Sequence, residues 1–207
     1  MKIGIIGAGY IGRAIAKLAV GQGHEVMVSN SRGPHTLMSL VASIGCLTGS
    51  VEQAAAFGEV VLVAIPLKNY LAVPAAPLAG KVVLDANNYY PERDGNMTEL
   101  DNHSITTSEL LARHLDGARI VKAFNSIRVN DLERDGLPTG TPGRRALPIS
   151  GDDARAKRQA TALIDQFGFD VVDAGPLAEG WRFQRGRPMY CERFDAVGLQ
   201  KALSDND

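Results

Sequence analysis

Apolar residues in this chain gather either in short continuous runs or in stripes with helical spacing. The first run, residues 3–6 (IGII), is typical of a strand buried on both faces of a parallel sheet. Beyond the glycines that follow, Ile11, Ile15 and Leu18 recur at spacings of three and four, which predicts a helix with one apolar face. Gly21 then ends the stripe, so the chain begins with a strand and a helix.

The same alternation continues along most of the chain. Further strands are expected at residues 25–30, 60–65, 82–85, 120–123, 146–150 and 169–172. Helices are expected at residues 36–44, 51–57, 108–114 and from a cap at Asp152 or Asp153 to Phe167. Because strands alternate with helices, we predict an α/β fold with a doubly wound, mostly parallel sheet.

Three segments interrupt this pattern. Residues 87–104 are polar and rich in turn formers, which predicts a surface excursion. Residues 126–145 hold several glycines and prolines and are expected to form a loop or hinge, after which residues 146–207 extend the same unit. Residues 204–207 are expected to fray. We therefore predict one domain over residues 1–207, with a short C-terminal extension.

Composition and charge narrow the choice of partners. The chain has 207 residues and a formal net charge of −1, with 22 Lys and Arg against 23 Asp and Glu, so we expect neither nucleic acid nor an anionic membrane as a partner. The longest apolar run, residues 60–66, falls far short of the roughly 20 residues of a membrane helix. Cys46 and Cys191 lie far apart without a metal-ligand pattern, and the N-terminus carries no secretion signal. These features predict a cytoplasmic protein without a disulfide or a metal site.

A glycine motif stands between the first strand and the first helix. Gly7, Gly9 and Gly12 form G-x-G-x-x-G, in which the glycines permit a tight turn, a close approach of pyrophosphate and close helix packing. Its position between a strand and a helix favours a Rossmann-type NAD(P)-binding fold over a glycine turn with a structural role alone. We count Tyr10 and Ile11, inside the motif, with the cofactor-binding residues.

The end of the second strand indicates which dinucleotide binds. NAD sites usually place an acidic residue there to bond the ribose 2′-hydroxyl, whereas this chain continues through Ser31 and Arg32. A hydroxyl and a planar guanidinium suit a 2′-phosphate, so the prediction is NADP. The alternative is that Arg32 is merely solvated in a turn before Pro34.

Five motifs together resemble one known family. They are the glycine motif and residues 29–34 (SNSRGP), 85–90 (DANNYY), 121–125 (VKAFN) and 173–177 (DAGPL). This combination resembles the coenzyme F420-dependent NADP oxidoreductase family over residues 1 to about 190. It is also similar to the NADPH-binding portion of six-transmembrane metalloreductases, whose membrane part this chain lacks. The resemblance implies that Ser31 and Arg32 receive the 2′-phosphate, that Ile65 and Pro66 lie along the nucleotide, and that Asn87 and Ala123 lie near the nicotinamide.

The implied chemistry is hydride transfer between NADP and a deazaflavin (coenzyme F420) or a flavin-like ring. Because the cofactors supply the reacting atoms, the absence of an obvious catalytic residue is consistent with it, and surface or capping roles are expected for the four histidines, His24, His35, His103 and His114. The alternatives are an NADP-dependent dehydrogenase of a small carbonyl or imine and a non-catalytic NADPH sensor. In each case the partner is a small molecule, and a homodimer is compatible with the sequence.

The tail from Trp181 to Tyr190 mixes aromatic residues with arginines. Arg182, Arg185 and Arg187 have the spacing to contact a flat anionic ligand such as F420. A basic surface arm or a subunit contact explains the same composition equally well, so both interpretations stay open.

Overall fold

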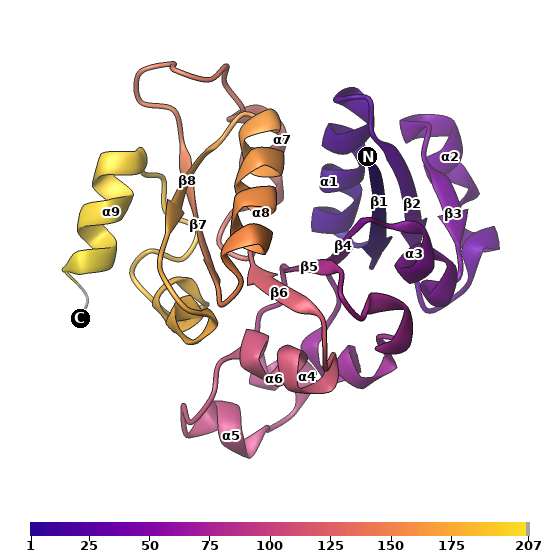
Figure 1. The fold of residues 1–207 in the computed structure, drawn as a ribbon, viewed down its shortest axis with the longest axis horizontal. Helices are drawn as coiled ribbons and strands as arrows, with labels where there is room; N and C mark the ends of the chain where they lie inside the picture. The colour runs from indigo at the N-terminus through magenta and orange to yellow at the C-terminus, as the bar shows by residue number, and fades with distance from the viewer. Residues whose placement is uncertain (206–207) are drawn as a thin grey trace.

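An eight-stranded sheet runs through the centre of this computed structural model, which describes residues 1–205 (Figure 1). The strand order is β3-β2-β1-β4-β5-β6-β7-β8, and neighbouring strands are parallel except β6 and β7. The strands are β1 (Lys2–Ile6), β2 (Glu25–Ser29), β3 (Leu47–Gly49), β4 (Val60–Val63), β5 (Val82–Asp85), β6 (Arg119–Lys122), β7 (Ala146–Gly151) and β8 (Asp170–Asp173). The first six follow the order of the dinucleotide-binding fold, which confirms the predicted α/β class.

The two faces of the sheet pack into separate apolar clusters. On β4, Val60 and Leu62 belong to one cluster, whereas Val61 and Val63 belong to the other, and all four side chains are buried. Parallel strands covered on both faces therefore need apolar residues at every position, which explains the continuous run in the sequence. The helices are α1 (Tyr10–Gly21), α2 (Met38–Ile44), α3 (Val51–Phe57), α4 (Pro91–Asp94), α5 (Thr98–Asp101), α6 (Thr107–His114), α7 (Val129–Arg134), α8 (Ala154–Gln166) and α9 (Ala196–Ser204).

Helices from distant parts of the chain cover each face. Residues of α1, α7 and α8 join the cluster that contains Ile3 and Ile5, whereas α3 and α6 supply Ala55 and Leu111 to the opposite cluster. Asp153 caps α8, since its carboxylate accepts a hydrogen bond from the N–H of Ala156 at 2.7 Å. The strands β7 and β8 continue the same sheet, with α9 packed beside them (Figure 1).

Most expected strands differ from the observed ones by one or two residues at an end, and hydrogen bonding explains two of these shifts. The run at 60–65 is a strand only to Val63, because the N–H of Ile65 leaves the ladder and donates to Asn87 Oδ1 at 2.9 Å. The last strand begins at Asp170 and not at Phe169, since the N–H of Phe169 closes the preceding helix by donating to the carbonyl of Ile164. Both ends are thus decided by contacts outside the strand itself.

Several short elements were not expected. The segment 87–104 holds α4 and α5, and its first residues Asn87 and Asn88 are buried, so it is not a surface excursion throughout. The expected loop at 126–145 contains α7, and the helix expected at 36–44 begins as a 3-10 turn (Pro34–Leu37). These elements are too short for periodicity to identify, as is β3.

The tail beyond residue 190 forms α9, where no element was expected. Asp195 caps this helix, and Leu199 and Leu203 pack against β7 and β8. Ala196, Leu199, Ala202 and Leu203 recur at spacings of three and four, a helical signal that our sequence analysis missed. Ser204 ends the helix, and Asn206 and Asp207, the rest of the expected frayed end, lie outside the described residues.

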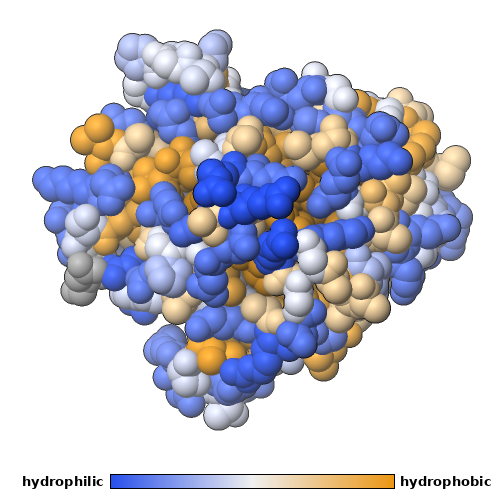
Figure 2. Space-filling model, viewed as in Figure 1, coloured by the Kyte–Doolittle hydropathy of each residue, from blue (hydrophilic) through white to orange (hydrophobic). Residues whose placement is uncertain are grey.

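The parallel strands end at the lower edge of the sheet in Figure 1, where α4, α5 and α6 gather. On the face shown in Figure 2, hydrophilic side chains dominate the middle and apolar side chains form separate patches. Within residues 1–205, the structure has no helix with the length and apolar character to cross a membrane. The carboxyl edge of the sheet is the place where such folds bind ligands.

Candidate functional site

The glycine loop joins β1 to α1 at this edge. A Cβ at Gly12 would lie 1.9 Å from the carbonyl oxygen of Gly7, and one at Gly7 would lie 2.2 Å from the carbonyl oxygen of Ala64. These two glycines are thus required for packing. Gly9 differs, because a Cβ there would meet nothing within 4 Å, and it begins α1 without a side-chain cap. The loop leaves open space and helix N–H groups on one side, which is the cradle that a pyrophosphate needs.

A cavity of about 470 Å³ opens beside this loop, and we name it the glycine-loop cavity. The ends of β1, β2 and β4 supply most of its wall. It is lined by Ile6, Gly7, Ala8, Gly9, Asn30, Ser31, Arg32, Val51, Ala64, Ile65, Pro66, Asn69, Ala72 and Val73. Among the described residues that line it, none is acidic, so nothing in its wall repels a phosphate. Six of the predicted cofactor-binding residues meet here, namely Gly7, Gly9, Ser31, Arg32, Ile65 and Pro66.

The turn after β2 holds Arg32 with its guanidinium available. The Asn30 side chain accepts a hydrogen bond from the N–H of Arg32 at 3.0 Å and donates to Thr36 Oγ1 at 2.9 Å, which fixes the turn. Within residues 1–205, the Arg32 guanidinium makes no hydrogen bond or ion pair, and both Ser31 and Arg32 are exposed. A hydroxyl and an unpaired cation at this position can receive a phosphate.

The other five predicted residues lie outside the lining of the cavity. Tyr10 is 82% exposed, Ile11 is half-buried and Gly12 is buried under the loop. Asn87 is buried beyond β5, and its Nδ2 has no hydrogen-bond partner among the described residues. Ala123 is buried at the end of β6, where its N–H donates to the carbonyl of Asp85. The Nδ2 of Asn87 is therefore a buried donor without an acceptor in the described chain.

A buried charged network lies beneath Asn87, and our sequence analysis missed it. Ser108 Oγ donates to Asp85 Oδ2 at 2.6 Å, and the Lys122 ammonium donates to Thr107 Oγ1 at 2.8 Å and to Ser108 Oγ and the Asn87 carbonyl at 3.3 Å. The N–H of Asn87 in turn donates to Asp85 Oδ1 at 3.0 Å. The network therefore holds the backbone of Asn87 on both sides.

Lys122 and Asp85 are fully buried. Burial lowers the pKa of Lys122 below its ordinary value, and the Asp85 carboxylate opposes part of that effect. The three protons of a lysine ammonium match its three acceptors here, so the geometry suits the charged form. The sequence signal was a charged residue at the last position of two buried strands.

Strain accompanies the turn after β6. Phe124 has a φ of 62°, in the left-handed backbone region that is energetically unfavourable for a bulky residue. Its side chain is 2% exposed and packs in the apolar core. The turn brings Asn125 against Asn88: Asn88 Nδ2 donates to the Asn125 carbonyl at 2.8 Å, and Asn125 Nδ2 donates to Asn88 Oδ1 at 3.2 Å. The ends of β5 and β6 are thus fastened together.

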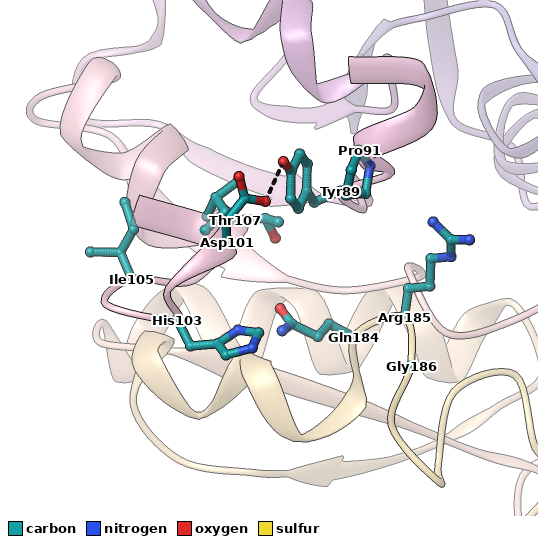
Figure 3. Close-up of a pocket in the computed structure, with 10 residues that line it drawn as sticks. Tyr89, Pro91, Asp101, His103, Ile105, Thr107, Gln184, Arg185 and Gly186 are labelled. Carbon is teal, nitrogen blue, oxygen red and sulfur yellow. Dashed lines mark hydrogen bonds between the residues drawn. The ribbon is translucent and has the colours of Figure 1, made fainter. Parts of the chain in front are cut away.

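A second cavity, of about 460 Å³, lies between residues 89–107 and the C-terminal segment (Figure 3). Tyr89 Oη donates to Asp101 Oδ1 at 2.7 Å on one wall, and His103 and Gln184 lie on another. Thr107 also lines it, and its Oγ1 is the group that accepts from Lys122. Because the Asn87 carbonyl and Thr107 Oγ1 both lie within 3.3 Å of the same lysine nitrogen, Asn87 is adjacent to this cavity.

A neighbouring hollow of about 360 Å³, the outer cavity, shares His103, Ile105 and Gln184 with the second cavity. It also contains Trp181 and Arg187. The two cavities are therefore neighbours along the C-terminal segment.

The three tail arginines have different partners. Arg185 pairs with Glu92 at 2.7 Å, and Arg182 pairs with Glu179. The Arg187 guanidinium stacks on Trp181, 4.5 Å from the ring centroid, and within the described residues it has no ion pair and no side-chain hydrogen bond. Only one of the three candidates thus combines a cavity with an unneutralised charge.

The histidines occupy separate places. His24 Nε2 contacts Gln166 Oε1 at 2.8 Å, His35 is exposed, and His114 Nε2 contacts the carbonyl of Val73 at 2.8 Å. His103 lines the second and outer cavities, a role that the sequence did not predict. No group of three or more His, Cys, Asp or Glu side chains in residues 1–205 is placed to hold a metal ion.

Comparison with known proteins identifies relatives. A family model described as NADP oxidoreductase, coenzyme F420-dependent, matches residues 2–89. Protein YjhV of Escherichia coli strain K12 is 35% identical over 72 residues, a match that covers 35% of this chain and 53% of YjhV, so the chain spans about half the length of this curated relative.

Two solved structures resemble the chain over most of its length. The hypothetical protein SMa0349 from Sinorhizobium meliloti is 30% identical with a TM-score of 0.80, over 94% of each chain. A candidate F420-dependent NADP reductase from Arthrobacter sp. FB24 is 25% identical with a TM-score of 0.73, over 87% of this chain and 88% of that one. The family match includes the glycine loop and the Ser31–Arg32 turn, and the two structures resemble the chain over most of its length. The chain therefore belongs to the family of NADP oxidoreductases described as coenzyme F420-dependent.

Proposed function

We propose that this protein binds NADP(H) in the glycine-loop cavity and transfers hydride between the nicotinamide and a deazaflavin- or flavin-like ring. The observation that carries the proposal is the unpaired Arg32 guanidinium beside Ser31, at the end of β2, in a cavity whose described lining has no carboxylate. NAD sites use an acid at that position to bind the ribose 2′-hydroxyl, whereas a hydroxyl and a guanidinium suit a 2′-phosphate.

The residues around the glycine loop would bind different parts of the nucleotide. Ser31 and Arg32 would receive the 2′-phosphate, and the open side of Gly9 with the N-terminus of α1 would receive the pyrophosphate. Ile65 and Pro66 would lie along the nucleotide, and the unpaired Nδ2 of Asn87 would donate to its nicotinamide end. NADPH, when bound, supplies a hydride with its electron pair, and the acceptor takes a proton from solvent to complete its reduction.

The second cavity is the place that we propose for the acceptor, which is a small molecule. It lies beside Asn87, since one lysine nitrogen bonds both the Asn87 carbonyl and the Thr107 hydroxyl. Aligning two rings and excluding water is sufficient for this reaction, because the reacting atoms belong to the two cofactors. The protein therefore needs no acid or base pair of its own.

Calorimetric titration with NADPH and with NADH tests the nucleotide assignment. Replacing Arg32 by Glu puts a negative charge beside the 2′-phosphate, so we expect NADPH affinity to fall about 100-fold and NADH affinity to change by less than about threefold. Arg158→Glu makes the same charge change at an exposed position of α8 outside the cavity, so it is the matched control and is expected to leave both affinities unchanged. Equal losses of NADPH and NADH in Arg32→Glu would refute the assignment.

Turnover tests the acceptor. Purified protein is mixed with NADPH and, separately, with F420, FMN, a ferric chelate and small carbonyls, while the absorbance near 340 nm is followed. Oxidation with F420 or FMN alone supports the proposal. Oxidation with a carbonyl alone would instead indicate a small-substrate dehydrogenase, and tight NADPH binding with no oxidation by any of them would indicate a sensor.

A further inference from the structure

We infer that the second cavity and the outer cavity form one elongated acceptor site, which takes a flat ring at Thr107 and an anionic side chain at Arg187. The inference rests on the proposed function for its ring end, but it names a ligand feature that hydride transfer does not require. It therefore assigns a specificity residue, Arg187.

The two cavities share part of their walls. His103, Ile105 and Gln184 line both, and the volumes of about 460 and 360 Å³ lie in the usual range for small-molecule sites. In Figure 3 the His103 and Gln184 side chains lie together on one wall, opposite Tyr89 and Asp101. A ligand longer than one ring is needed to fill both.

The Thr107 end is suited to a ring that gains electrons. Thr107 Oγ1 accepts from the buried Lys122 ammonium at 2.8 Å, and its own O–H has no acceptor among the described residues. A hydroxyl that accepts from a cation is a stronger donor, so it would bond a ring oxygen or nitrogen on which negative charge develops. This end also lies next to Asn87, where the nicotinamide is proposed.

The Arg187 end is suited to an anion. The guanidinium is stacked on Trp181, which holds its plane in place, and it lacks a carboxylate partner within the described chain. One acidic side chain, Glu109, lines the same cavity, but its carboxylate accepts the N–H of Thr106 at 2.7 Å in the cap of α6. Arg182 stacks on the same tryptophan from another position but pairs with Glu179. Glu109 keeps its negative charge, but its carboxylate is held at the helix cap by that N–H. The group at this end that can bind a phosphate or carboxylate chain is therefore the Arg187 guanidinium.

Two pairs of probes separate the ring from the anion. FMN differs from riboflavin by its phosphate, and F420 differs from its ring-and-ribityl precursor FO by its phosphate-linked acidic tail. Quenching of ligand fluorescence measures the affinity of each without NADPH. In the wild-type protein we expect the anionic member of a pair to bind about tenfold more tightly than its neutral partner. One partly exposed hydrogen bond between the guanidinium and a phosphate accounts for a difference of that size.

Substitutions assign this preference to one side chain. Arg187→Gln is expected to remove the tenfold preference and to leave the affinity for riboflavin or FO unchanged, and Arg187→Lys is expected to restore part of it because the charge returns. Arg182→Gln is the matched control, since Arg182 contacts the same Trp181 but lines neither cavity and has Glu179 as its partner. It is expected to keep the preference.

Three outcomes would overturn the inference. They are no binding of either pair, a preference that survives in Arg187→Gln, and an equal loss in Arg182→Gln. None of these depends on NADPH, so a failure here is distinct from a failure of the nucleotide assignment, which the titrations of Arg32→Glu measure separately.

Discussion

Replacing Lys122 by Met tests the buried network on which the carboxyl edge depends. Methionine has similar length but no charge, so the change leaves the fully buried Asp85 carboxylate without its cation. It also removes the hydrogen bonds of the ammonium to Thr107, Ser108 and the carbonyl of Asn87. Ser108 Oγ bridges the two charges, since it donates to Asp85 and accepts from the Lys122 ammonium. Leaving a buried charge uncompensated costs about 3–5 kcal/mol, so we expect a loss of up to that size in the free energy of unfolding.

A second variant separates charge from packing. In the double variant Asp85→Asn/Lys122→Met the buried carboxylate is gone as well, and the amide can still accept from Ser108 Oγ. We expect the two substitutions to interact, with a coupling energy of about 1–3 kcal/mol in favour of the double variant. If the loss came only from the shape of the methionine side chain, the second substitution would recover nothing.

Urea denaturation followed by circular dichroism measures both quantities. Lys17→Met, at an exposed position of α1, is the control and is expected to change the free energy of unfolding by less than about 0.5 kcal/mol. A loss below about 1 kcal/mol in Lys122→Met, or additive losses in the double variant, would refute the account of Lys122 and Asp85 as a coupled buried pair.

Three further predictions concern the same regions. Because burial lowers the pKa of Lys122, the unfolded chain keeps a proton that the folded chain releases between the lowered pKa and the ordinary value of 10.5. Over that range, the free energy of unfolding of the wild type relative to Lys122→Met should rise with pH. A difference that stays constant from pH 7 upward would contradict this. Gly9→Ala should keep the melting temperature and weaken NADPH binding in calorimetry at least tenfold. Gly12→Ala, whose Cβ would meet the carbonyl of Gly7, should lower the free energy of unfolding by about 3 kcal/mol. Similar effects of the two substitutions on stability would count against separate roles. Ser50→Ala removes the capping box of α3 and should cost about 1 kcal/mol in urea denaturation, with no measurable loss being the opposing result.

Much of the fold followed from local pattern. The runs at β4 and β5 are buried along their whole length, so they carried an unmistakable signal, and the G-x-G-x-x-G motif fixed what lies between β1 and α1. The four-residue helices α4 and α5 gave no such signal, because each is too short to show a period. The apolar positions of α9 do recur at helical spacing, and our sequence analysis missed them.

The candidate site, too, was predicted from the sequence only in part. The sequence named Ser31 and Arg32, since a phosphate site at the end of β2 is built from consecutive residues. It counted three tail arginines as equals, and only the folded chain distinguishes Arg187 from two neighbours that meet Glu92 and Glu179. Charge neutralisation depends on partners up to about 90 residues away, which spacing along the chain does not encode.

The sequence by itself determined the α/β class, the glycine loop and the hydroxyl and guanidinium after β2, because each arises from neighbouring residues and from the two-residue and 3.6-residue periods of the backbone. The tertiary structure decided that Lys122, Asp85, Thr107 and Ser108 form one buried network and that residues 89–107 face the tail across a cavity. Parallel strands bring their carboxyl ends together only when the sheet is assembled, so residues from separate loops become neighbours at that edge and nowhere earlier.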